Sequence, residues 1–116
     1  MPHNKVDDTV PGYVYVLYFG IKGDKIWHVG TTRNLQRRMK EHNRYTGIKG
    51  IMEEVFLKRR MYGLIRCEKA SLAYWIEQII HAYPYNWDEK VLKWIVESFG
   101  GEWDERGIDW TREQMQ

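Results

Sequence analysis

The chain has little with which to cross-link itself or to enter a membrane. It contains one cysteine, Cys67, so no disulfide can form within it, and such low cysteine usage is typical of reducing compartments. No apolar run approaches the ~18 residues that a membrane-spanning helix needs. The polar residues 1–11 lack the apolar core of a signal peptide. We therefore expect an intracellular, cytoplasmic protein with no membrane partner.

The chain is also short, and its size limits the architecture. Its 116 residues and 14.1 kDa correspond to one domain with a modest core. Six tryptophans and eight tyrosines are many for this length. Aromatic rings fill cores, but they also stack on nucleic-acid bases, so composition leaves both uses open.

Charge is divided unevenly along the chain. Residues 1–70 carry 14 Lys and Arg against 7 Asp and Glu, a net charge of +7, whereas residues 71–116 carry 4 against 9, a net charge of −5. The basic half suits an anionic partner such as nucleic acid. The acidic half would weaken that binding or face away from it.

Apolar runs near the N-terminus predict an antiparallel hairpin. Gly12–Phe19 is rich in β-branched and aromatic residues, as is typical of strands. Ile21–Lys25 contains the Gly and Asp of a turn, and Ile26–Gly30 predicts the returning strand. We expect a third, loosely bounded strand at Val55–Lys58.

Three further segments predict helices. The first spans Asn34–Asn43, after two threonines that can cap it. The second spans Ala70–Tyr83 and ends before a proline. The third begins with Asn86 as its cap and ends near Phe99, before two glycines. The second helix has the clearest apolar stripe, formed by Leu72, Ile76, Ile79, Ile80 and Tyr83.

Side chains suited to one reaction follow each other along these elements. Tyr15 lies on the first strand, His28 on the second, Arg38 and His42 on one face of the first helix, and Glu77 beside the stripe of the second. Metal-assisted phosphodiester cleavage needs an activated water, offset charge on the transition state and a metal ligand. This ordered set of groups indicates a small nuclease.

The motifs resemble those of the GIY-YIG nuclease superfamily, in its small stand-alone branch or its phage homing-type catalytic domains. The sequence YVYVL at Tyr13–Leu17 matches the first motif, and HVG at His28–Gly30 matches the second. TTRNLQRRMKEHN then matches the helix of the family. Glu77 and Asn86 fall where the family has its metal-binding glutamate and a later asparagine.

The resemblance covers about residues 12–90 and implies an α+β fold, a small three-stranded antiparallel sheet flanked by helices. Two positions depart from it. Tyr13 stands in place of the glycine of the first motif, and His28 stands in place of the tyrosine of the second. The implied organisation is a flexible N-terminal arm at 1–11, a catalytic domain at 12–100 and a C-terminal tail at 101–116, which is either docked or the start of a linker.

The resemblance also implies roles for the site residues. Glu77 would hold one Mg²⁺ or Mn²⁺ per active site, and Arg38 would contact the scissile phosphate. Tyr15 would orient or deprotonate the attacking water, and His28 would take over proton abstraction or bind a phosphate. His42 would bind a phosphate or the water. Each side chain also has a plain structural interpretation, and it is their joint occurrence that favours a site.

Other residues have weaker assignments. Gly30 and Asn86 would support the site, and Asn86 is also a good helix cap. His3 and His81 match no motif, and we expect no role for either. Contacts to nucleic acid are expected from Tyr13, Arg33, Arg44, Lys49, Lys58, Arg59 and Arg60.

Together these features predict a metal-dependent endonuclease acting on DNA, with RNA left open as a substrate, in an intracellular protein of phage or mobile-element type. Two alternatives stay open. One is a catalytically weak nucleic-acid-binding or adaptor module on the same fold, and the other is a catalytic fragment of a longer homing-type enzyme. The protein would act as a monomer or a homodimer.

Overall fold

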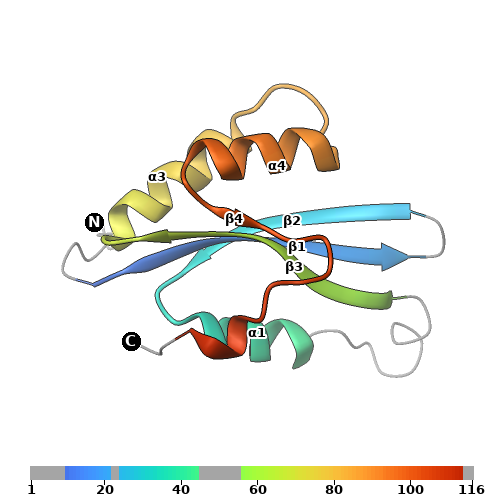
Figure 1. The fold of residues 1–116 in the computed structure, drawn as a ribbon, viewed down its shortest axis with the longest axis horizontal. Coiled ribbons are helices and arrows are strands. Elements are labelled where there is room, and N and C mark those ends of the chain that lie inside the picture. Colours follow the sequence, from blue (N-terminus) through green and yellow to red (C-terminus); the bar gives the residue numbers. More distant parts are fainter. Residues whose placement is uncertain (1–9, 22–23, 45–55, 114–116) are drawn as a thin grey trace, which may run out of the picture.

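The first strand of the chain is central in the sheet. The computed structural model describes residues 10–21, 24–44 and 56–113. Strand β1 (Gly12–Ile21) pairs antiparallel with β2 (Asp24–Thr32) on one side and with β3 (Phe56–Cys67) on the other. A two-residue strand, β4 (Glu102–Trp103), extends the sheet beyond β3. The order is therefore β2-β1-β3-β4, with β2 at one edge (Figure 1).

Helices cover both faces of this sheet. Helix α1 (Leu35–Arg44) lies on one face, and α3 (Ala70–His81) and α4 (Glu89–Ser98) lie on the other (Figure 1). The expected α+β fold, an antiparallel sheet flanked by helices, is confirmed. The sheet contains a fourth strand, β4, besides the three that were expected. This strand is too short to be recognised from its sequence pattern.

Alternation along β1 divides the core in two. Val14 and Val16 pack with α3 and α4, whereas Tyr13, Tyr15 and Leu17 pack on the α1 side. Successive side chains of a strand point to opposite faces, so one strand supplies both cores. The tyrosines of the first motif are thereby directed away from α3 and α4.

Strand β3 is much longer than the segment Val55–Lys58 that sequence predicted. It continues to Cys67 and pairs with the whole of β1, with irregular register near Val16 and Leu17. Charged residues such as Arg60 and Arg66 interrupt its apolar pattern. Alternation was therefore too weak to extend the prediction.

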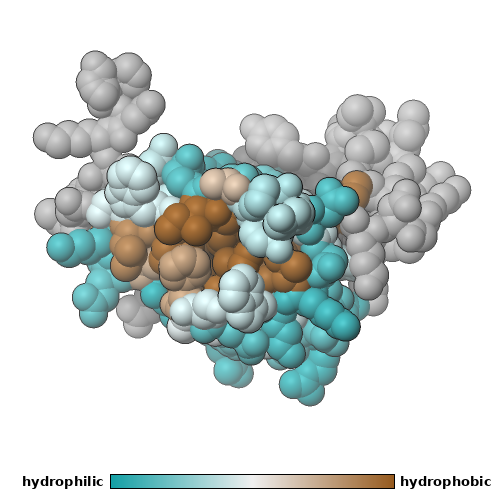
Figure 2. Space-filling view, turned by 90° about the horizontal axis from the view of Figure 1, so that it is seen from above, coloured by the Kyte–Doolittle hydropathy of each residue, from teal (hydrophilic) through white to brown (hydrophobic). Residues whose placement is uncertain are grey.

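The exposed and buried faces of α3 differ in part from the predicted stripe. Leu72 is 50% exposed and Ile79 is 54% exposed, so placing them in the buried stripe was wrong. Small residues lie against the sheet instead, because β1 and α3 approach closely: a Cβ at Gly12 would lie 2.7 Å from the Cα of Ala70. Figure 2 shows the apolar side chains that gather on the outer face of this helical layer. The buried residues of α3 are Ala70, Ala73, Ile76 and Ile80.

Helix α4 starts later than predicted. Its cap is Asp88, whose carboxylate accepts a hydrogen bond of 2.8 Å from the N–H of Val91. The predicted cap, Asn86, is exposed in the preceding loop. Either side chain can cap a helix, and the structure uses the one directly before the first helical turn.

Residues 101–113, after Gly100, pack on the rest of the molecule. Ile108 is buried in the α1-side core, and its N–H donates to the carbonyl of Met61 at 2.7 Å. Trp110, in the short 3₁₀ helix η1 (Trp110–Arg112), packs against the same core. Residues 101–113 thus complete the layer that carries α1.

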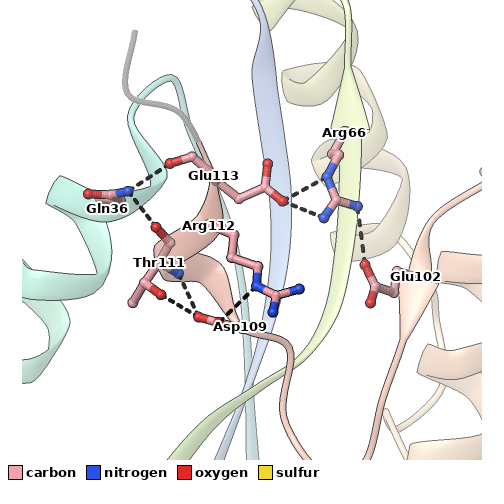
Figure 3. Close-up of polar contacts among 7 residues, drawn as sticks. All are labelled: Gln36, Arg66, Glu102, Asp109, Thr111, Arg112 and Glu113. Atoms are coloured by element: carbon pink, nitrogen blue, oxygen red, sulfur yellow. Dashed lines mark hydrogen bonds and ion pairs between the residues drawn. The ribbon is translucent and has the colours of Figure 1, made fainter.

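Polar contacts hold this segment to α1 and β3 (Figure 3). The Gln36 side-chain amide donates to the carbonyls of Thr111 at 2.8 Å and Glu113 at 2.7 Å. The guanidinium of Arg66 pairs with the carboxylates of Glu113 and Glu102. The C-terminal segment therefore bridges the helix and the sheet.

Residues 1–9, 22–23, 45–55 and 114–116 lie outside the described residues. The first of these ranges holds most of the expected arm, and 45–55 includes the predicted phosphate contact Lys49. Within the described ranges, no helix is long and apolar enough to cross a membrane.

Candidate active site

Tyr15 lies across the glycine of the second motif. The register pairs Tyr15 on β1 with Gly30 on β2. A Cβ at Gly30 would lie 2.5 Å from the phenol oxygen of Tyr15 and 2.7 Å from its Cζ. Such contacts are shorter than van der Waals distances, so any larger residue at position 30 would displace the ring. The hydroxyl end of Tyr15 is therefore positioned by the absence of a side chain on the neighbouring strand.

This contact predicts a defect in Gly30→Ala. Tyr15 is 2% exposed and has little room to move, so we expect a loss of about 1–3 kcal/mol in the free energy of unfolding together with reduced activity. Urea denaturation measures the first effect. Gly63→Ala is the milder comparison, since its Cβ would meet its nearest atom, in the ring of Trp103, at 3.0 Å, and we expect it to lose less stability. A Gly30→Ala protein as stable as Gly63→Ala would contradict the packing argument.

His28 lies beside Tyr15. The two ring centroids are 5.9 Å apart. Burial lowers the pKa of His28 below its usual value, and the charges of His81 and Arg38 lower it further. The imidazole is therefore neutral at pH 7 and can accept a proton.

The pKa of Tyr15 is raised to about 12. Burial is the largest cause; Arg38 opposes it, and the carboxylates of Glu77 and Glu41 add to it. With that pKa the phenol keeps its proton at neutral pH and can donate a hydrogen bond. Whether Tyr15 orients or deprotonates the attacking water stays a prediction.

Arg38 reaches the site from the first turns of α1. The helix begins at Leu35 because the Asn34 carboxamide accepts a bond of 3.0 Å from the N–H of Arg37, and the Thr32 hydroxyl accepts one of 3.0 Å from the N–H of Asn34. Asn34 is thus the cap of the helix. The Arg38 guanidinium is half-exposed, 3.7 Å from the carboxylate of Glu41, and remains accessible to an anion.

Glu77 approaches from α3, on the opposite face of the sheet. Its side chain is 18% exposed, and its carboxylate lies 3.8 Å from Nε2 of His81. No group of three or more His, Cys, Asp or Glu that could hold a metal ion occurs among the described residues. This donor set does not suit zinc, which takes three or four protein ligands. It fits Mg²⁺, which keeps most of its waters and binds through one or two carboxylates.

His81 matches no sequence motif, yet it lies at the margin of the site. Its Nε2 is 3.0 Å from the carbonyl oxygen of Val29, between His28 and Gly30 on the edge strand. Its ring packs against Trp87, with centroids 5.1 Å apart. The spacing of four residues from Glu77 on one helix was the signal that could have identified it.

Comparison with known families adds to this geometry. The family model described as the T5orf172 domain matches residues 12–103, which is most of the chain and includes all four strands. The chain belongs to the T5orf172 domain family. This family is associated with nuclease-like, DNA-related function, which agrees with the broader part of the sequence-based interpretation. Neither the curated proteins nor the solved structures include a match to the chain.

Three residues predicted to contact nucleic acid have different surroundings in the T5orf172 domain. Tyr13 is 7% exposed, beside Glu113. Burial raises its pKa, as does that carboxylate, and the buried ring leaves little surface on which a base could stack. Arg60 donates to the carbonyl of Glu105 at 3.3 Å. Arg33 is exposed directly before α1.

The other predicted site residues of this domain stay predictions. Asn86 is exposed between α3 and α4, and its supporting role stays a prediction. Four predicted residues belong to described elements, but their side chains lie outside what the structure describes: His42 and Arg44 in α1, and Lys58 and Arg59 in β3.

Proposed function

We propose that this T5orf172 domain is a metal-dependent endonuclease of the GIY-YIG kind, which hydrolyses phosphodiester bonds in DNA. One observation carries the proposal. Tyr15, His28, Arg38 and Glu77 come from four different elements, yet the charges of Arg38 and Glu77 both act on Tyr15, whose ring adjoins His28. Such pKa effects require proximity.

The residues divide the reaction among them. Neutral His28 accepts the proton of the attacking water, which the hydroxyl of Tyr15 orients by donating a hydrogen bond. Arg38 pairs with the non-bridging oxygens of the phosphate and offsets the charge that grows on them. Glu77 would hold Mg²⁺ or Mn²⁺, which when bound stabilises charge on the leaving 3′ oxygen.

Charge supports nucleic acid as the substrate. Four exposed basic residues lie in or just before α1: Arg33, Arg37, Arg38 and Lys40. The chain up to residue 70 is strongly basic. Clustered Lys and Arg bind phosphates by releasing counterions, so affinity should fall as salt rises. Helices α3 and α4, which belong to the acidic part of the chain, lie on the other face of the sheet from α1 (Figure 1).

A plasmid assay tests the function directly. Purified protein is incubated with supercoiled DNA in Mg²⁺, in Mn²⁺ and with a chelator. The proposal expects nicked or linear products with either metal and none with chelator. Binding without cleavage in both metals would favour the binding-module alternative, and selective cleavage of an RNA of the same sequence would change the substrate class.

Arg38→Ala tests the phosphate contact. We expect the cleavage rate to fall by ~10²-fold, as when one transition-state donor is removed. Arg37→Ala is the matched control, because its side chain is exposed and points about 100° away on the helix. The pKa of His28, followed by NMR, should rise in Arg38→Ala, since that positive charge lowers it. Greater sensitivity of Arg37 would show that the wrong arginine was assigned.

A further inference from the structure

One imidazole nitrogen joins α3 to the edge of the sheet. Nε2 of His81 lies 3.0 Å from the carbonyl oxygen of Val29. A carbonyl can only accept, so Nε2 carries the hydrogen and donates it. Val29 belongs to β2, an edge strand, and its neighbours in sequence are His28 and Gly30. The bond thus ties the last residue of α3 to the segment of β2 that forms the site.

The same nitrogen also faces the proposed metal ligand. Glu77 precedes His81 by four residues, and its Oε2 lies 3.8 Å from Nε2. The N–H therefore lies near a carbonyl of β2 and a carboxylate of α3 at once. Carboxylates and imidazoles that surround a metal ligand commonly orient it without touching the metal.

The residues around the hydrogen bond between His81 and Val29 hold both of its partners in place. The ring of His81 packs on Trp87 from the α3–α4 loop. Val29 is 2% exposed and Ile80 is fully buried, so the backbone on both sides of the bond is held by the core. A displacement of His81 would move Glu77, one helical turn away.

We propose that His81 is a positioning residue that holds the Glu77 carboxylate toward Tyr15 and His28 by anchoring α3 to the carbonyl of Val29. This role rests on the proposed nuclease function, because it concerns the same site. Catalytic groups misplaced by about 1 Å can lose ~10²-fold in rate. The donated hydrogen bond, rather than the titration of the imidazole, is the property that matters.

Two substitutions separate this role from its rivals. His81→Gln keeps an N–H donor at similar reach and carries no titratable proton. His81→Phe keeps a ring against Trp87 and removes the donor. We expect His81→Gln to retain cleavage within ~3-fold, and His81→Phe to lose about 10- to 100-fold in kcat with little change in KM. Gln78→Ala, an exposed change on the same helix, is the control.

Two measurements test the role of His81 without requiring DNA cleavage. They therefore distinguish an error in this role from an error in the proposed nuclease function. Mn²⁺ affinity, from paramagnetic resonance, should weaken in His81→Phe and be restored in His81→Gln. The carbonyl ¹³C shift of Val29 should change in His81→Phe and stay near wild type in His81→Gln. Both remain measurable if the wild-type protein cuts no DNA.

Two results would overturn the role. If His81→Phe matched wild type in Mn²⁺ affinity and in the Val29 shift, the ring would merely pack on Trp87. If a well-folded His81→Gln lost as much activity as His81→Phe, a proton on the imidazole would matter instead of the donor.

Discussion

Glu77→Ala should abolish DNA cleavage at normal Mg²⁺ concentrations while leaving DNA binding largely intact. The Glu77 carboxylate is the proposed ligand of the metal, and a bound metal contributes several kcal/mol of transition-state stabilisation, so we expect a loss of at least ~10³-fold. Phosphate contacts by the basic residues do not require that carboxylate, which is why binding should survive.

The control for this change is Glu97→Ala. Glu97 is an exposed glutamate on α4, so it reports the effect of removing one negative helix charge away from the site. Plasmid cleavage and a fluorescence-anisotropy binding assay are run on both variants. A second readout is the pKa of Tyr15, which should fall in Glu77→Ala because the Glu77 charge raises it. Full cleavage by Glu77→Ala would refute the assignment of the metal ligand.

His28→Ala should lose most of the cleavage activity, by about 10²- to 10⁴-fold, the usual contribution of a general base. The cleavage rate of the wild-type protein should also fall at low pH. His28 is the active base only when neutral, so activity is lost as pH falls through its pKa. Burial lowers that pKa below the usual 6.5, so the decline should lie below about pH 6.5.

His28→Tyr restores the residue that the GIY-YIG resemblance implies at this position. We expect it to retain measurable activity with its acid limb moved to higher pH, because an unperturbed phenol loses its proton near pH 10. Gln78→Ala, an exposed change on α3, is a control that should keep the pH profile of the wild-type protein. If His28→Ala had both the wild-type rate and the wild-type profile, His28 would be structural and another group would accept the proton.

The kinds of side chain in the site were easier to predict from sequence than their pKa values. The order of Tyr15, His28, Arg38 and Glu77 along the chain was enough to propose that they act together. The pKa of Tyr15 depends on burial against the charge of Arg38, and burial prevails. Burial is a property of the packed molecule, so residue identity alone could not give the direction of that pKa shift.

Contacts between distant segments were likewise outside the reach of sequence patterns. His81 touches Val29, 52 residues away, and Gln36 touches Thr111, 75 residues away. Periodicity describes which face a residue occupies within one element, and it carries no information about which backbone carbonyl that face will meet. The same limit explains why Tyr13, on an apparently accessible motif, proved to be buried next to Glu113.

The sequence by itself determined the α+β class, the hairpin of β1 and β2, the approximate extents of α1 and α3, and the side chains available for chemistry. These follow from local alternation, helical spacing and capping residues, which act over a few positions. Only the tertiary structure decided how far β3 extends, that residues 101–113 dock, and that Leu72 and Ile79 face outward while alanines face the sheet. Those outcomes depend on how closely two surfaces can approach, as at Gly12 against Ala70 and Tyr15 over Gly30, and close packing is settled only when all the elements are assembled.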